Sequence, residues 1–306
     1  MHTDQKPLLV SIVGPTAVGK TSLAIETAHH FETEIVSADS RQFYRELKIG
    51  TAKPSQEELE EVPHHFINSH SINHDYNAGA YERDAKELLE VLFKKYHMII
   101  AVGGSTLYLK ALWEGFDEMP SVPNKVREGL NEEFSSHGLQ KLLLELQKLD
   151  PDYYVEVDKN NAQRVIRALE VIRATGKPFS SFRLSKKKEL PYRNLKIGLS
   201  MEREVLFDRI NQRMDVMIRE GLFEEVQSLS SFRNHNALQT VGYSEIFDHY
   251  AGEYDRDEAV RLLKRNSRRY AKRQLTWFRK YPDIHWFESR NKGEIFKLIE
   301  ANLLEN

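Results

Sequence analysis

Short apolar runs alternate with amphipathic stretches over the first third of the chain and again near its end. Continuous apolar runs at residues 8–13 and 98–102 predict strands buried on both faces, as in a parallel sheet. Further strands are predicted at residues 34–38, 195–200 and 284–287. Apolar positions three and four residues apart predict helices over residues 20–31, 78–95, 203–220, 257–280 and 293–304. The pattern indicates an α/β fold, with a parallel sheet that has helices on both faces.

The middle of the chain has a different pattern. Residues 117–195 show little sign of strands, and Pro120 and Pro123 mark a linker. Helices are expected over residues 125–136, 139–147 and 162–174. We therefore expect a core formed by residues 1–116 and 196–306, interrupted by a mostly helical insertion domain at 117–195.

A phosphate-binding loop follows the first predicted strand. It reads Gly-Pro-Thr-Ala-Val-Gly-Lys-Thr and stands directly before a predicted helix. Glycines let backbone N–H groups approach phosphate oxygens, and the helix directs its positive end at the same anion. The residues expected to bind a diphosphate are Gly14, Pro15, Thr16, Ala17, Val18, Gly19, Lys20 and Thr21. Thr21 is also the candidate Mg²⁺ ligand, but the loop does not identify the diphosphate.

Composition narrows the class of protein. The chain has 306 residues, 40% of them hydrophobic, and no cysteine, which excludes disulfides, thiolate metal sites and cysteine nucleophiles. No apolar run is long enough to span a membrane and no secretory signal is evident, so we expect a cytoplasmic protein. The formal net charge of −2 argues against a uniformly basic nucleic-acid binder, so any such function needs a local patch.

Two strand ends carry further candidate chemistry. Asp39 follows the second predicted strand, where a carboxylate can act as a general base or an Mg²⁺ ligand, or can instead cap a helix. Gly103 and Gly104 follow the strand at 98–102, where NTP-hydrolysing relatives carry an acid. This favours a kinase or a transferase with a diphosphate leaving group over a motor-type ATPase. Parallel strands should bring both ends and the phosphate loop to one crevice.

A basic run near the C-terminus is the strongest charge feature. Residues 261–281 contain no acid and nine cations: Arg261, Lys264, Arg265, Arg268, Arg269, Lys272, Arg273, Arg279 and Lys280. Like charges at helical spacing repel, so a polyanion is favoured over a solvated face as the explanation. Arg164 and Arg167, one turn apart on a predicted helix of the insertion, could also grip a nucleic-acid backbone.

Together these residues resemble the tRNA dimethylallyltransferases, also called tRNA isopentenyltransferases. The resemblance covers nearly the whole chain through an ordered set of motifs: residues 14–21, 39–44, 49–54, 63–65, 103–108, 163–164, 167–171, 176–178, 241–243 and 271–278. Ser105 departs from the family, which usually has threonine there, but it keeps the hydroxyl. Without cysteine the chain lacks the zinc finger of many eukaryotic relatives, so it looks bacterial in type.

The resemblance implies transfer of a dimethylallyl group from dimethylallyl diphosphate to N6 of adenine 37, beside the tRNA anticodon. Mg²⁺ is the implied cofactor, and the loop would bind an isoprenoid diphosphate although its motif is that of an ATP site. Asp39 would be the base, Arg127 would stabilise the departing diphosphate, and Ser105 would add a hydroxyl donor. No obligate protein partner is evident, so a monomer is expected.

The anticodon stem-loop of tRNA is the implied macromolecular partner. The residues implied to contact it are Asp39, Ser40, Arg41, Gln42, Gln163, Arg164, Val165, Ile166, Arg167, Lys272 and Arg273.

Three other functions share some of these features. A small-molecule or nucleotide kinase could place ATP in the loop, although the basic run would then be unexplained. An adenylate dimethylallyltransferase shares the loop but acts on free AMP. A non-catalytic RNA-binding protein with a degenerate nucleotide fold is disfavoured by the intact Lys20, Thr21 and Asp39.

Overall fold

The computed structural model describes residues 6–74, 76–183 and 188–304. The chain divides into two compact units, the first formed by residues 1–114 and 189–306 and the second by residues 115–188. No helix within the described ranges is long and apolar enough to cross a membrane.

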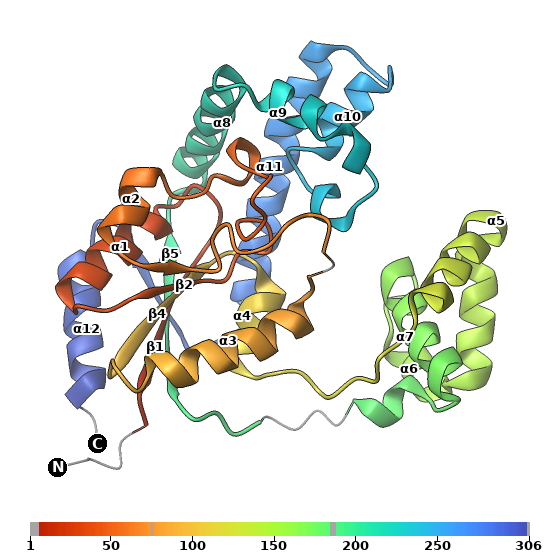
Figure 1. Cartoon of the computed structure of the whole chain (residues 1–306), viewed down its shortest axis with the longest axis horizontal. Helices are drawn as coiled ribbons and strands as arrows, with labels where there is room; N and C mark the ends of the chain where they lie inside the picture. The colour runs from red at the N-terminus through yellow and green to blue at the C-terminus, as the bar shows by residue number, and fades with distance from the viewer. Residues whose placement is uncertain (1–5, 75, 184–187, 305–306) are drawn as a thin grey trace. The chain divides into compact units, whose positions relative to one another are not determined.

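The first unit is built on a six-stranded sheet in the order β3-β2-β4-β1-β5-β6 (Figure 1). Every pairing is parallel, which confirms the expected α/β class. The strands are β1 Leu8–Val13, β2 Ile35–Ser37, β3 His64–His65, β4 Met98–Gly103, β5 Arg193–Ser200 and β6 Ile284–Glu288. Only β3 was not expected, because two residues give no readable pattern.

Helices cover both faces of this sheet. On one face, alternate residues of β1 such as Val10 and Ile12 join a core with residues of α1 (Lys20–His30) and α12 (Lys292–Leu304). On the other face lie α3 (Ala78–Leu92) and α4 (Thr106–Trp113), where Trp113 donates to the Ser11 hydroxyl at 2.9 Å. The central strands are therefore buried on both sides, which explains their continuous apolar sequence.

The remaining helices of the first unit stand mainly beyond the carboxyl ends of the strands (Figure 1). Helix α8 (Arg203–Arg219) ends one residue earlier than its predicted range of 203–220, and α11 (Arg256–Phe278) begins one residue earlier and ends two residues earlier than its predicted range of 257–280. These helices are α2 Gln56–Glu61, α8 Arg203–Arg219, α9 Leu222–Ser228, α10 Ser244–Tyr250 and α11 Arg256–Phe278. Helices α2, α4, α9 and α10 were not expected, because one or two turns carry too few residues to establish a period.

The second unit is helical throughout its secondary structure. It contains α5 (Asn124–Leu149), α6 (Pro151–Glu156) and α7 (Ala162–Thr175) around a core that includes Leu142 and Leu169. Helix α5 is broken at Gly138, whose φ is 72° and ψ 178°, so it consists of two helices, as the sequence predicted. The left-handed φ at this position suits glycine.

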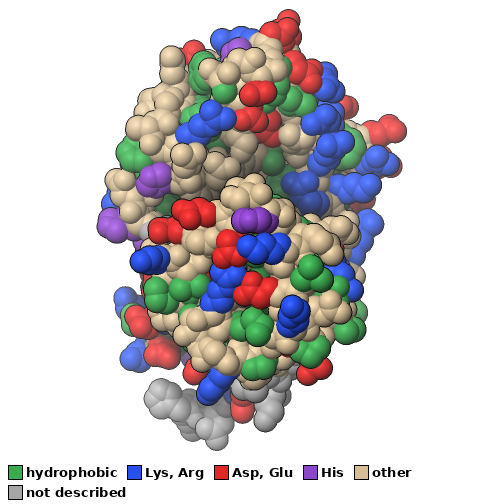
Figure 2. All heavy atoms as spheres, turned by 90° about the vertical axis from the view of Figure 1, so that its right-hand side faces the viewer, with side chains coloured by type: hydrophobic (Ala, Val, Ile, Leu, Met, Phe, Trp, Pro, Cys, Tyr) green, Lys and Arg blue, Asp and Glu red, His purple; other side chains and the backbone are tan. Residues whose placement is uncertain are grey.

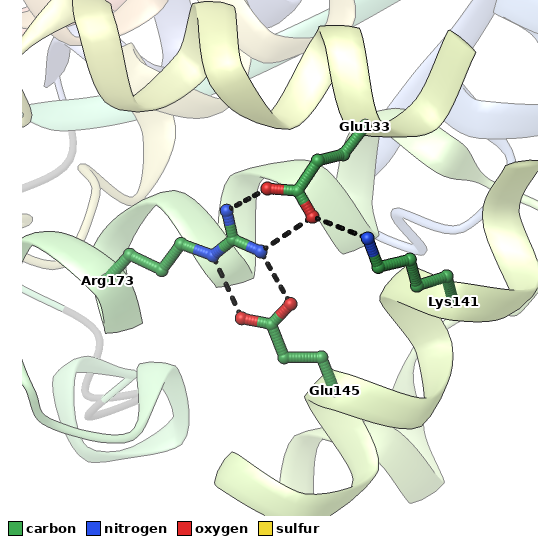
Figure 3. A network of polar contacts seen from close by, with 4 residues as sticks. All are labelled: Glu133, Lys141, Glu145 and Arg173. Atoms are coloured by element: carbon green, nitrogen blue, oxygen red, sulfur yellow. Dashed lines mark hydrogen bonds and ion pairs between the residues drawn. The ribbon is translucent and has the colours of Figure 1, made fainter. Parts of the chain in front are cut away.

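A charged network ties the two halves of α5 to α7 (Figure 3). Arg173 makes a bidentate contact with Glu145, at 2.9 and 2.6 Å, and reaches Glu133 at 2.6 Å. Lys141 adds an ion pair to Glu133 at 3.6 Å. Because Glu133 precedes the break and Glu145 follows it, Arg173 fixes the angle between the two halves.

Candidate active site

The phosphate loop connects β1 to α1, as expected. Its curvature comes from left-handed φ values of 146° at Gly14, 64° at Ala17 and 103° at Gly19. A Cβ at Gly14 would lie 2.7 Å from the carbonyl oxygen of Leu199, so only glycine fits there. The loop therefore packs tightly against β5 while its other side faces the pockets described below.

Gln274 on α11 joins the loop to the turn after β4. Its side-chain oxygen accepts from the Thr16 backbone N–H and its amide donates to the Gly104 carbonyl, both at 2.9 Å. A Cβ at Gly104 would clash with this amide, and one at Gly103 with the Ala38 backbone. The two glycines thus allow α11 and the segment after β2 to approach the turn after β4 closely. Gln274 lies on the basic helix α11. The charge pattern of that helix gave no indication that this glutamine links the phosphate loop to the turn after β4.

Lys20 begins α1 and faces the cradle of the loop. Its Nζ donates to the Pro15 carbonyl at 2.8 Å. Burial and the nearby Arg213 lower the pKa of Lys20 to about 8, while Asp39 acts in the opposite direction. A cation held with so little solvation gains more from a bound anion than an exposed lysine would.

Asp39 holds a turn directly after β2. Its Oδ1 accepts from the backbone N–H groups of Arg41 at 2.9 Å and Gln42 at 3.4 Å. Among the described residues, Oδ2 accepts no such bond. The carboxylate caps a turn, and not the helix that the capping alternative expected, through one oxygen, and it leaves the other for chemistry.

Ser105 supports the same turn from the end of β4. Its hydroxyl accepts from the Ser40 N–H at 2.8 Å and donates to the Ser40 hydroxyl at 3.1 Å. On the neighbouring α11, burial followed by the charge of Asp39 raises the pKa of Tyr270 to about 12. Tyr270 therefore remains a protonated hydroxyl beside the carboxylate.

Two adjoining pockets meet at this carboxylate. The smaller, about 80 Å³, contains the loop residues Lys20 and Thr21 together with Gly103 and Gly104. The larger, about 250 Å³, extends to an apolar wall that includes Met214, Met217 and Leu222. The residues that line both are Thr16, Asp39, Thr51, Ala52, Arg213 and Tyr270. The phosphate loop and both strand ends therefore lie at one crevice, as the parallel order predicted.

Arg213 on α8 is the main site residue that the sequence did not reveal. It donates to the Thr16 hydroxyl at 3.5 Å and to the Ala52 carbonyl at 3.3 Å. Burial lowers the pKa of Arg213, although Asp39 opposes that shift. A lone arginine on an amphipathic helix carries no local signal, since its role depends on tertiary placement.

The residues next to Asp39 are used largely within the protein. The Gln42 amide donates to the carbonyls of Thr51 at 3.3 Å and Ala52 at 3.1 Å. Arg41 donates to the Ser40 carbonyl at 3.0 Å, and its Nε is buried with no hydrogen-bond partner among the described residues. Ser40 and Arg41 line the larger pocket, and Gln42 lines the smaller.

The remaining candidates of the insertion lie in the second unit. On α7, Gln163 and Arg164 are exposed and Arg167 is partly exposed, whereas Val165 and Ile166 are fully buried in the core of the unit. Of these five residues, Gln163, Arg164 and Arg167 are therefore the ones that can contact a partner. Arg127 on α5 bonds to Gln163 at 3.0 Å and pairs with the buried Glu170 at 3.1 Å. Its proposed role at the diphosphate stays a prediction.

The basic helix α11 carries both paired and exposed cations. Arg261 pairs with Glu258 and Lys264 with Asp215, each at 2.6 Å. Lys272 and Arg273 are exposed about two turns farther along the helix. Figure 2 shows Lys and Arg side chains gathered along the right-hand edge of one face, with Asp and Glu side chains among them. Lys272 and Arg273 are therefore among the cations of this helix that a polyanion could reach.

The fold and the site together define a phosphate-loop α/β enzyme in which a strand-end carboxylate faces the loop. A family model described as IPP transferase matches residues 42–281. The chain belongs to this IPP transferase family.

Individual relatives match over nearly the full length. A tRNA dimethylallyltransferase from Cytophaga hutchinsonii is 51% identical over 297 residues, covering 97% of this chain and 98% of the relative. A solved tRNA isopentenylpyrophosphate transferase from Bacillus halodurans is 38% identical, with a TM-score of 0.72 and 97% of each chain covered. A eukaryotic dimethylallyltransferase, described as acting on tRNA, is 27% identical with a TM-score of 0.77, over 92% of this chain and 73% of that one.

Proposed function

We propose that this protein transfers the dimethylallyl group of dimethylallyl diphosphate to N6 of adenine 37 in tRNA and releases diphosphate. The observation that carries the proposal is the position of Asp39, which lines both the phosphate-loop pocket and the larger pocket beside it. A base at this junction can reach an amine whose reaction partner is held by the loop.

The leaving group would be bound by the phosphate loop. Lys20 and Arg213 supply positive charge, and the start of α1 directs its dipole at the same point. As the bond from carbon to oxygen breaks, negative charge grows on the diphosphate. Charges that are already fixed in place stabilise this state with little reorganisation.

The residues present fit a magnesium ion that is bound mainly through the substrate. No group of three or more His, Asp or Glu side chains suited to a metal occurs within the described part of the chain. Thr21 lines the smaller pocket, and Mg²⁺ commonly binds one or two protein oxygens besides phosphates and water. When bound, Mg²⁺ would offset charge on the diphosphate.

Asp39 would activate the adenine amine. The N6 lone pair is delocalised into the ring, so the amine is a weak nucleophile until its proton is accepted. The N6–carbon bond forms while the carbon–oxygen electrons leave with diphosphate, and the N6 proton passes to Oδ2 of Asp39. Oδ1 meanwhile stays bonded to the turn, which keeps the carboxylate oriented. A positioned base of this kind accelerates the reaction by about 10²–10⁴-fold.

The tRNA would supply the base from outside the stack. Extrusion of a loop nucleotide costs a few kcal/mol, which contacts to the backbone must offset. The exposed Lys272 and Arg273 on α11 and the exposed residues of α7 are the candidates for those contacts. We further propose that the second unit contributes to tRNA binding and that the protein acts as a monomer.

The direct test is the reaction itself. The protein is incubated with Mg²⁺, dimethylallyl diphosphate and unmodified tRNA, and the nucleosides are analysed by mass spectrometry. One adenosine beside the anticodon should gain a single C5H8 unit. Modification of AMP in preference to tRNA, or phosphate transfer from ATP without alkylation, would contradict the proposal.

A further inference from the structure

Glu225 on α9 lines neither pocket, yet it is bonded to the start of the turn whose end, at Thr51 and Ala52, lines both. Its Oε2 accepts from the backbone N–H groups of Lys48 at 3.1 Å and Ile49 at 2.7 Å. Its Oε1 accepts from the Gly50 N–H at 3.2 Å and from the Tyr243 hydroxyl at 2.6 Å. One carboxylate thus satisfies four donors from two distant segments.

The three N–H groups begin the short 3-10 helix η1 (Ile49–Thr51). The first N–H groups of a helix have no partner within it, and a carboxylate there makes charge-assisted bonds to all of them. Tyr243 fits closely against the same turn, because a Cβ at Gly50 would lie 2.6 Å from its ring. Helix η1 is therefore held by both charge and packing.

The turn ends in an unusual conformation at Ala52. Its φ of 48° and ψ of 50° are left-handed, which residues with a side chain rarely adopt. Such a conformation persists only where its surroundings fix it. The bonds from Glu225 at the start of the turn are one such constraint, and Gln42 at its end is another.

Ala52 connects this turn to the charged part of the site. Its carbonyl accepts from Arg213 at 3.3 Å, and Arg213 also reaches the Thr16 hydroxyl of the phosphate loop at 3.5 Å. The position of the Ala52 carbonyl therefore helps to orient the guanidinium of Arg213 toward the phosphate loop.

We propose that Glu225 is a positioning residue, which fixes η1 so that the Ala52 carbonyl holds Arg213 against the phosphate loop. The inference rests on the proposed function only in taking Arg213 to face the donor diphosphate. It predicts that loss of Glu225 weakens diphosphate binding through Arg213.

The test measures binding of inorganic pyrophosphate with Mg²⁺ to the full-length chain by calorimetry. Glu225→Ala should raise the Kd about tenfold or more, since charge-assisted bonds are lost. Glu225→Gln keeps one acceptor oxygen and should rescue part of the loss, and it serves as the test if the alanine variant does not fold. Glu224→Gln, which removes the same charge from the neighbouring exposed position, should leave the Kd within about twofold.

A double-mutant cycle identifies the route. In an Arg213→Lys background, the Glu225 variant should raise the Kd by less than about twofold further, because its partner is already removed. Hydrogen exchange of the amides at 48–50 should rise in the variant. An unchanged Kd in both Glu225 variants, or effects of Glu225 and Arg213 that simply multiply, would overturn the inference. Wild-type protein that binds no pyrophosphate would instead overturn the donor site itself.

Discussion

At the scale of single residues, the two oxygens of Asp39 have separable roles. Asp39→Asn keeps the Oδ1 acceptor that holds the turn and removes the basic oxygen. Single-turnover transfer should slow by about 10²–10⁴-fold while the thermal unfolding midpoint stays near that of the wild type. A rate reduced less than about tenfold would show that Asp39 is not the base.

The lowered pKa of Lys20 predicts a pH dependence. Since its pKa is about 8 rather than 10.5, the side chain loses its charge as the pH rises through 8. The kcat/KM for dimethylallyl diphosphate should therefore fall above that pH, because the neutral amine no longer attracts the donor. Lys20→Arg, which stays charged, should have lower activity but no such decline.

Lys53 is the matched control for that profile. Burial also lowers the pKa of Lys53 to about 8, but its ammonium bonds to the Tyr44 carbonyl and to Asn68 and lines neither pocket. Lys53→Arg should keep the decline near pH 8. A decline that disappears in Lys53→Arg and persists in Lys20→Arg would exclude the proposed role of Lys20.

At the scale of elements, one face of α11 packs against the active site and the other carries exposed cations. Its buried Gln274 joins the loop to β4, while Lys272 and Arg273 are exposed. Replacing these two cations by alanine should weaken tRNA binding and lower the slope of log K against log salt by about two. Binding measured over a series of salt concentrations checks this, with pyrophosphate affinity as the control that should not change.

The network around Arg173 predicts how the second unit responds to mutation and acid. Arg173→Met should lower the free energy of unfolding by about 1–3 kcal/mol, since two carboxylates lose their charge-assisted bonds. Hydrogen bonding to Arg173 lowers the pKa of Glu133 below its usual 4.5, so this stabilisation is present above pH 4.5 and is lost as pH falls through the lowered value. Urea unfolding at pH 7 and pH 3 tests both points, and an equal loss at the two pH values would contradict the assignment.

Long periodic elements were predictable, and short ones were not. The 3.6-residue period of α7 and α8 and the apolar runs of β1 and β4 established their type from sequence. The two-residue β3 and the seven-residue α9 gave no comparable pattern, although α9 carries Glu225. Val165 and Ile166 were expected to contact tRNA but are buried, because a sequence motif does not say which of its residues face outward.

At the scale of the whole molecule, the order of strands along the sequence predicted where the site lies, but not which residues of distant helices enter it. Parallel strands bring their carboxyl ends together, so the sequence alone assigns the phosphate loop, Asp39 and Gly103 to one crevice. Arg213 and Tyr270 enter that crevice from α8 and α11, and their place depends on how those helices pack. Tertiary packing of this kind leaves no trace in the local sequence.

The central claim is that the loop at residues 14–21 holds the leaving group while Asp39 faces the accepting amine. A crystal structure with an unreactive analogue of dimethylallyl diphosphate and a tRNA anticodon stem-loop tests it most directly. The diphosphate should lie in the loop, and N6 of an extruded adenine should lie about 3 Å from Oδ2 of Asp39. A diphosphate bound elsewhere, or an adenine that approaches the donor from a side remote from Asp39, would contradict it.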